Sequence, residues 1–258
     1  MAKRKKIIKR KKVDEYLIYG IHGAIEVLES KRLKIVSVHI MKDGTASRRK
    51  EVLSILNKSR FNITTLQKEV FLKKYHGFRS QGIVVNFIGN IVKDVPSFKK
   101  LKGNICLLIL SDIEDPQNIG QIIRTSECAG VNGIVIPKHG GSRITNAVLQ
   151  VSQGAFMHMP IYETGNLGNL LIRLKDDGFW ITGLENSIDE KYWFEIDYSG
   201  KTAIVVGSEG KGIRSGILKA CDFKATIPME GKTNSLNVSA TVSAILFERQ
   251  RQLALKSE

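Results

Sequence analysis

Cysteine is scarce in this sequence of 258 residues, which contains only Cys106, Cys128 and Cys221. The three form no CxxC pair and no metal-ligand spacing, so we expect reduced, mostly buried thiols, as in a cytosolic protein. The five histidines also lack metal spacing, and no Ser/His/Asp set is evident. These absences disfavour zinc and hydrolase chemistry.

Long apolar runs are missing as well. No stretch approaches the roughly 18 consecutive apolar residues of a membrane span, and the first residues lack the apolar core of a secretion signal. They are rich in Lys rather than in Ser and Arg, which favours the cytoplasm over an organelle. With 42% hydrophobic residues, the composition is typical of a globular protein of one large or two ordinary domains.

Positive charge is in excess, with a net charge of +15. Residues 3–12 hold eight Lys and Arg and no acid, and subtracting these eight charges from +15 leaves +7 for the rest of the chain. The surplus predicts a polyanionic partner, and nucleic acid is favoured over a membrane because no amphipathic apolar face accompanies the basic run. The alternatives are a tail (1–12) that only improves solubility and, for Arg48, Arg49 and Lys50, a solvated helix face.

The first part of the chain predicts a small α/β domain over residues 13–92. A strand or turn runs into a helix at 16–29, and alternating patterns follow: strands at 34–42, 62–67 and 82–88, and helices at 47–60 and 69–78. Residues 93–104 are polar and contain a proline, so we expect a linker there.

The second part, residues 105–258, predicts a parallel sheet covered by helices on both faces, because strands and helices alternate. The expected strands are 105–113, 133–137, 159–163, 179–185, 202–209 and 224–229. The expected helices are 118–130, 144–156, 167–178, 214–221 and a last one from Val238.

Ligands of open α/β sheets bind beyond the carboxyl ends of strands. After the 105–113 strand come Asn118, where a helix begins, and Arg124. The six-residue spacing is about 1.7 helical turns, so the two side chains share no face unless Asn118 lies in the turn before the helix. The alternative is an N-cap followed by a solvent-exposed arginine.

After the 202–209 strand comes "GSEGKGI", whose Gly207, Gly210 and Gly212 permit close approach of a ligand. The spacing is neither a P-loop nor GxGxxG. Glu209 stands at the end of a buried strand, either as a site residue or as a cap or partner of Lys211.

The stretch "MEGKTNSLNVSATVSAILFERQR", Met229 to Arg251, begins as a polar loop and continues as a helix. One capping residue is enough for a helix, whereas this entrance holds Asn234, Ser235 and Asn237. The surplus of small hydrogen-bonding side chains therefore indicates a ligand.

Together, "DPQNIGQIIRTSECAG", "IVVGSEGKGI" and "IPMEGKTNSLNVSATVSAILFE" resemble, in order and spacing, the three signature motifs of the SpoU/TrmH family of RNA ribose 2′-O-methyltransferases. The likeness covers about residues 105–250. In the first part, "IYGIHGAIEVL" and "SQGIVV" resemble the small substrate-binding domain of bacterial members, which act on a guanosine of 23S ribosomal RNA.

The resemblance implies S-adenosylmethionine as cofactor, a deep trefoil knot in the C-terminal domain, and a homodimer whose active sites combine residues of both subunits. RNA is the implied partner, with neither membrane nor metal. The implied catalytic residues are Asn118, Arg124, Glu209, Ser235 and Asn237. The implied cofactor contacts are Leu184, Gly207, Ile227, Met229 and Leu236.

In the family, Arg124's counterpart is assigned the removal of the hydroxyl proton. Because a guanidinium pKa exceeds about 12, we expect Arg124 instead to bind the adjacent RNA phosphate and to stabilise developing oxyanion charge. Asn118 would orient Arg124 or the ribose, and Glu209 would accept a hydrogen bond from Asn237.

Three alternatives stay open: a transfer-RNA ribose methyltransferase, an enzyme for another ribosomal nucleotide, and a catalytically silent RNA-binding ribosome-assembly factor. The intact set of five implied catalytic residues argues against a silent site.

Overall fold

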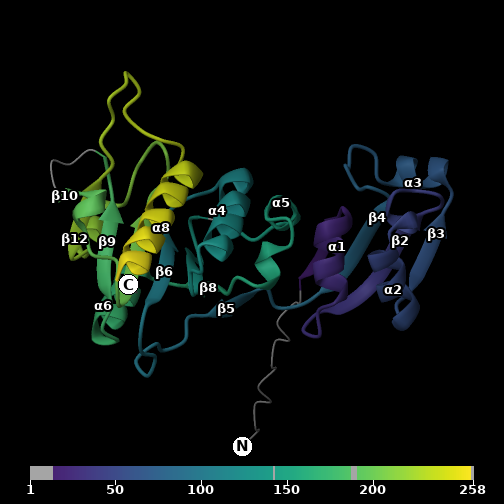
Figure 1. Ribbon diagram of the computed structural model, residues 1–258, viewed down its shortest axis with the longest axis horizontal. Coiled ribbons are helices and arrows are strands. Elements are labelled where there is room, and N and C mark those ends of the chain that lie inside the picture. The colour runs from purple at the N-terminus through teal and green to yellow at the C-terminus, as the bar shows by residue number, and fades with distance from the viewer. Residues whose placement is uncertain (1–13, 142, 187–190, 257–258) are drawn as a thin grey trace, which may run out of the picture. The chain divides into compact units, whose positions relative to one another are not determined.

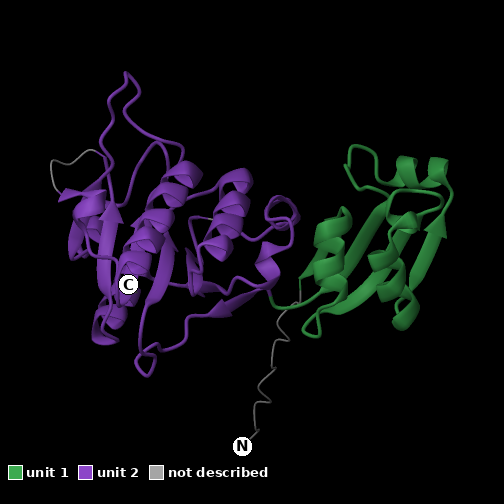
Figure 2. Cartoon of the chain, in the orientation of Figure 1, with its two compact units in different colours: residues 1–90 green, residues 91–258 purple. Residues whose placement is uncertain are grey.

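The computed structural model describes residues 14–141, 143–186 and 191–256. The predicted basic tail, residues 1–12, lies outside the described residues. The chain divides into two compact units, residues 1–90 and residues 91–258, which are coloured separately in Figure 2. Each unit is described by itself.

Unit 1 is a four-stranded mixed sheet in the order β1-β4-β2-β3. Its elements are β1 (Glu15–Tyr19), α1 (Ile21–Leu28), β2 (Lys34–Met41), η1 (Ala46–Arg48), α2 (Lys50–Lys58), β3 (Ile63–Leu66), α3 (Lys68–Lys74) and β4 (Ile83–Ile88). Central β4 runs antiparallel to β1 and β2, and β3 runs parallel to β2. The small α/β fold predicted from the sequence is confirmed, with helices that are a few residues shorter than expected.

Unit 2 is an eight-stranded sheet in the order β10-β12-β9-β11-β6-β7-β8-β5 (Figure 1). Its strands are β5 (Val92–Asp94), β6 (Ile105–Leu110), β7 (Gly133–Pro137), β8 (Ile161–Thr164), β9 (Trp180–Leu184), β10 (Lys191–Tyr192), β11 (Lys201–Val206) and β12 (Phe223–Thr226). All pairs of neighbouring strands are parallel. The predicted parallel sheet is therefore confirmed.

Helices cover both faces of this sheet, which explains why all six residues of β6 are buried. The helical elements are α4 (Pro116–Cys128), α5 (Asn146–Val151), η2 (Ala155–Met157), α6 (Leu167–Asp176), η3 (Trp193–Glu195), α7 (Ser215–Lys219) and α8 (Val238–Leu255). Leu171 and Leu174 of α6 pack with Leu107 and Ile109 of β6 in one hydrophobic cluster. Leu108, which alternates with them, points to the opposite face, where α4 and α8 lie together (Figure 1).

The prediction of a linker at 93–104 is wrong. Strand β5 pairs with β8, which places it in unit 2 rather than at the end of the first domain. Phe98 is only 4% exposed and packs edge-on against Phe179. Its N–H donates to the Asp177 carboxylate at 2.8 Å. The segment looks like a linker in sequence because one aromatic residue anchors it among polar neighbours.

Cys106 and Cys221 are buried and Cys128 is exposed, and all three are free thiols, as predicted. Burial raises the pKa of Cys106 to about 11 and that of Cys221 to about 12. Within the described ranges, no helix has the length and apolar character needed to cross a membrane. The trefoil knot stays a prediction.

Candidate active site

The carboxyl ends of four neighbouring strands lie level at one edge of the unit 2 sheet. Leu184 at the end of β9 is in register with Val206 of β11 and with Ala225 of β12, and Val206 is in register with Leu110 of β6. The loops that follow these strands therefore leave the sheet side by side. Most residues singled out from the sequence motifs lie in these loops or at their ends, whereas Arg124 lies further along α4.

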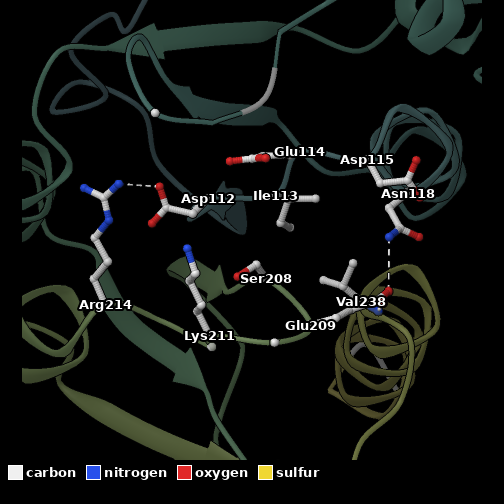
Figure 3. Close-up of a pocket in the computed structure, with 13 residues that line it drawn as sticks. Asp112, Ile113, Glu114, Asp115, Asn118, Ser208, Glu209, Lys211, Arg214 and Val238 are labelled. Atoms are coloured by element: carbon white, nitrogen blue, oxygen red, sulfur yellow. Dashed lines mark hydrogen bonds and ion pairs between the residues drawn. The ribbon is translucent and has the colours of Figure 1, made fainter.

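Two adjoining cavities open at this edge. The first, here called the acidic cavity, has a volume of about 500 Å³ and is lined by Asp112, Glu114, Asn118 and other side chains shown in Figure 3. The second, the glycine-loop cavity, measures about 450 Å³ and extends from the end of β9 to the start of α8. Residues 208–212 line both cavities, so the glycine loop is the wall between them.

Three residues, one from each of the three sequence motifs, meet at this wall. Asn118 Nδ2 donates to Glu209 Oε1 at 3.1 Å (Figure 3). Asn237 Nδ2 donates to the same oxygen at 2.5 Å and to Asn118 Oδ1 at 2.9 Å. The predicted hydrogen bond from Asn237 to Glu209 is thus present, and Glu209 bonds these amides rather than Lys211. We call Asn118, Glu209 and Asn237 the amide–carboxylate cluster.

Helix α4 begins earlier than the sequence suggests. Asp115 is its N-cap and accepts the Gln117 N–H at 3.0 Å, with Pro116 in the first turn. Asn118 therefore lies inside the helix, so it is not the N-cap and does not turn toward Arg124. Arg124 is exposed and lines neither cavity.

The glycine loop is closed by its own backbone. Gly212 has φ +61° and donates its N–H to the Ser208 carbonyl at 2.9 Å. A Cβ on Gly207 would lie 2.1 Å from the carbonyl carbon of Gly212, so only glycine fits there. A Cβ on Gly210 would meet no atom within 4 Å.

The polar residues that precede α8 have two structural roles. Asn237 Oδ1 accepts the Ser239 N–H at 2.9 Å and so caps the helix, while its Nδ2 holds Glu209. Ser235 and Leu236 line the glycine-loop cavity, and Leu236 is 41% exposed there. One asparagine is therefore both helix cap and candidate site residue, and Asn234, Ser235 and Leu236 before it form part of a cavity wall.

The implied cofactor residues divide into two groups. Leu184, Gly207 and Leu236 line the glycine-loop cavity, as does Ser235 of the implied catalytic set. Ile227 and Met229 line neither cavity, because they lie in the loop that projects past the end of β12 (Figure 1).

The sequence reasoning missed Glu185 and Asn186, which also line the glycine-loop cavity. Both directly follow a buried strand, β9, which is the signal that singled out Glu209 after β11. Among the described residues, no group of three His, Cys, Asp or Glu side chains is placed to hold a metal ion.

Residues 106–247 match the profile of the SpoU rRNA Methylase family. The chain belongs to this family. It is 33% identical over 247 residues to a Staphylococcus saprophyticus protein assigned to the TrmH family of tRNA/rRNA methyltransferases, a match that covers 92% of this chain and 95% of that one. YacO of Bacillus subtilis, assigned likewise, is 30% identical over 92% of this chain and 96% of its own length.

Solved structures share the fold of this SpoU methylase. The SpoU methyltransferase AviRb from Streptomyces viridochromogenes, solved in complex with its cofactor AdoMet, matches with a TM-score of 0.78 and 20% identity, covering 93% of this chain and 91% of that one. A TrmH family protein from Porphyromonas gingivalis matches with a TM-score of 0.72 and 21% identity, covering 92% and 90%. The chain is thus an RNA methyltransferase of the SpoU/TrmH family, whose members use S-adenosylmethionine.

The glycine-loop cavity of this SpoU methylase fits that cofactor. Its volume of about 450 Å³ lies within the usual range for small-molecule sites. Leu184 and Leu236 supply apolar surface, and Leu236 is 41% exposed, so its side chain is open to contact with a ligand. The glycine loop supplies backbone polar groups without side chains that would obstruct a ligand.

Proposed function

We propose that the chain transfers the methyl group of S-adenosylmethionine to a ribose 2′-hydroxyl of RNA, with a guanosine of 23S ribosomal RNA as the favoured target. The observation that supports this best is the amide–carboxylate cluster, whose Glu209 lines both adjoining cavities. We assign the glycine-loop cavity to the cofactor and the acidic cavity to the target nucleotide. The cluster stands where the two ligands would meet.

The cofactor supplies an electrophilic methyl group, and the residues of the chain hold the two reactants in position. Holding two reactants in line contributes about 7–11 kcal/mol to a displacement reaction. Glu209 fixes the amides of Asn118 and Asn237, which leaves Asn118 oriented toward the ribose. Arg124 binds the adjacent phosphate and stabilises negative charge that develops on the attacking oxygen. The phosphate or a water takes the proton, because an arginine is not a base at neutral pH.

We propose that Arg124 acts in the active site of a partner subunit and not in that of its own chain. It is exposed and lines neither cavity of its own chain, although the four other implied catalytic residues lie at or beside those cavities. We therefore infer a homodimer in which Arg124 of one chain completes the site of the other. Such a shared site is compatible with two-fold symmetry, in which each chain gives and receives the same group.

Subunit complementation tests this arrangement. We expect Arg124→Ala and Asn237→Ala dimers to be inactive alone. After unfolding and refolding together, they should regain about a quarter of wild-type activity, since half of the dimers then carry one intact site of two. No recovery, with mixed dimers shown by mass spectrometry, contradicts a shared site.

Unit 1 is proposed to bind the RNA substrate. It contains a cavity of about 790 Å³ lined by Lys42, Arg48, Arg49 and Lys68, with Asp43 and Glu69 as the acidic residues. Among the described residues, no ion pair or side-chain hydrogen bond engages these four cations. Unpaired cations around a cavity suit RNA phosphates, and such contacts add affinity and salt dependence more than sequence choice. Lys50 does not line the cavity.

The experiment that tests the proposed function is tritium transfer from labelled S-adenosylmethionine to total RNA. The RNA is prepared from the cytoplasm, because we propose that the protein acts in that compartment. Size fractionation separates the ribosomal from the transfer-RNA alternative, and nuclease digestion should release 2′-O-methylguanosine. RNA binding without transfer favours the assembly-factor alternative. An Arg124→Lys variant with full activity would argue against bidentate phosphate binding.

A further inference from the structure

Two polar side chains of the glycine-loop cavity, Glu185 and Asn186, lie outside the three sequence motifs. They follow β9, which is hydrogen-bonded to β11 on one side and to β12 on the other. The Glu185 N–H donates to the Ala225 carbonyl at 3.0 Å, so this short segment continues along β12. It therefore stands between the loops that follow β11 and β12.

Glu185 holds the glycine loop. Its Oε2 accepts the Ile213 N–H at 3.0 Å. A Cβ on Gly212 would lie 2.2 Å from the same oxygen, so the carboxylate fills the space against the loop backbone. Ile213 is itself 5% exposed and belongs to the hydrophobic core, which fixes the far end of the loop. The near end is fixed by β11, and Glu185 joins the far end of the loop to the end of β9.

Asn186 holds the opposite wall. Its Oδ1 accepts the Ile227 N–H at 3.3 Å, and its Nδ2 donates to the Asn234 carbonyl at 3.4 Å. The loop between these residues has neither helix nor strand. Within the described part of the chain, these are the only hydrogen bonds made by residues 227–236. One amide thus ties both ends of the loop segment that leads into Ser235 and Leu236.

We propose that Glu185 and Asn186 are a pair of positioning residues that set the width of the cofactor cavity, by tying its two walls to the same strand end. The proposal rests on the assignment of the glycine-loop cavity to S-adenosylmethionine. Neither residue needs to take part in methyl transfer. Their effect is on cofactor affinity, through the loops that contain Gly207, Ser235 and Leu236.

Binding of S-adenosylhomocysteine, measured by titration calorimetry on the full chain, tests the pair. We expect Glu185→Ala and Asn186→Ala each to weaken binding about tenfold, the effect of one or two lost hydrogen bonds that hold a wall. Glu185→Gln keeps an acceptor oxygen and should bind within about twofold of wild type. Asn186→Asp places an oxygen against the Asn234 carbonyl and should stay as weak as the alanine variant.

Asn169→Ala is the matched control, because Asn169 is exposed on α6 and its side chain makes no bond among the described residues. Thermal unfolding without ligand separates positioning from folding: the proposal requires weaker binding by a protein that melts near the wild-type temperature. If an alanine variant does not fold, the two conservative variants test the proposal instead: Glu185→Gln should bind nearly as tightly as wild type, whereas Asn186→Asp should bind more weakly.

Unchanged affinity in both alanine variants would overturn the proposal. So would a Glu185→Gln variant as weak as Glu185→Ala, because the mechanism needs only an acceptor. Wild-type chain that fails to bind S-adenosylhomocysteine would count against the proposed function instead. Wild-type binding with unaffected variants would leave that function intact and refute the positioning pair alone.

Discussion

Replacing Gly207 by alanine gives the sharpest test of how the glycine-loop cavity, the proposed cofactor site, is built. The added methyl group would lie 2.1 Å from the carbonyl carbon of Gly212, 2.2 Å from its oxygen and 2.4 Å from the Ile213 nitrogen. All three atoms are backbone, so no side-chain rotation can relieve the overlap. The glycine loop has to open.

The structure sets the size of the effect. Non-bonded carbon atoms pack at about 3.5–4.0 Å, so the two parts of the loop must separate by roughly 1.5 Å. This movement breaks the bonds from Gly212 N–H to Ser208 at 2.9 Å and from Ile213 N–H to Glu185 at 3.0 Å. At about 0.5–1.5 kcal/mol for each bond, the loss is about 1–3 kcal/mol, as in overpacked cores. Cofactor affinity should fall about ten- to hundredfold.

Gly210→Ala is the control, because it adds the same methyl group to the same loop where no atom lies within 4 Å. The assay is the dissociation constant of S-adenosylhomocysteine by calorimetry, with urea unfolding of each variant. We expect Gly210→Ala to unfold like wild type and to bind more tightly than Gly207→Ala. Equal affinities of the Gly207 and Gly210 variants would refute the reasoning that the closed loop shapes the site.

Three further predictions concern stability. Burial and Lys74 lower the pKa of His39 in the folded state. As the pH falls, the unfolded state therefore binds the proton at a higher pH than the folded state, and β2 should lose hydrogen-exchange protection below about pH 6.5. A His39→Gln variant with the same pH dependence would contradict this. Arg249 is 3% exposed and its Nε has no partner among the described residues. Arg249→Met should therefore raise the free energy of unfolding by about 1 kcal/mol or more, and a loss would contradict it. Gly120→Ala places a methyl 2.4 Å from Val151 Cβ and should cost about 1–3 kcal/mol in urea unfolding. A Gly120→Ala/Val151→Gly double variant, which removes that Cβ, should lose less than the sum of its single changes.

The parallel sheet could be predicted because its central strands carry their own signal. β6 is apolar at all six positions, and such a run needs helices on both faces. Strand β5 gives no such signal, since it has three residues, of which two are exposed. Its place in the sheet depends on pairing with β8, more than sixty residues away. The pairing partner, and not the strand's own residues, therefore determines whether a short polar segment of this kind forms an edge strand.

The candidate site was predictable to the extent that its residues follow buried strands or begin helices. Asn118, Glu209 and Asn237 satisfy that rule, and the structure brings them together. Arg124 does not converge with them, because Asp115 rather than Asn118 starts α4. A shift of three residues in a helix start turns a side chain by most of a turn, and sequence patterns do not locate helix ends that closely.

The hydrogen bonds of the site also give a reason why its residues come from four strands. Glu185 ties the loop after β11 to β9, Asn186 ties the loop after β12 to β9, and Glu209 joins the loop after β11 to α4 and α8. The loops after β11 and β12 are therefore each held by a side chain that follows β9. A site connected in this way is formed by the fold itself, so binding need not order the loops. The same connection means that a change in one loop moves the others, so mutations in this region should act on cofactor affinity in a non-additive way.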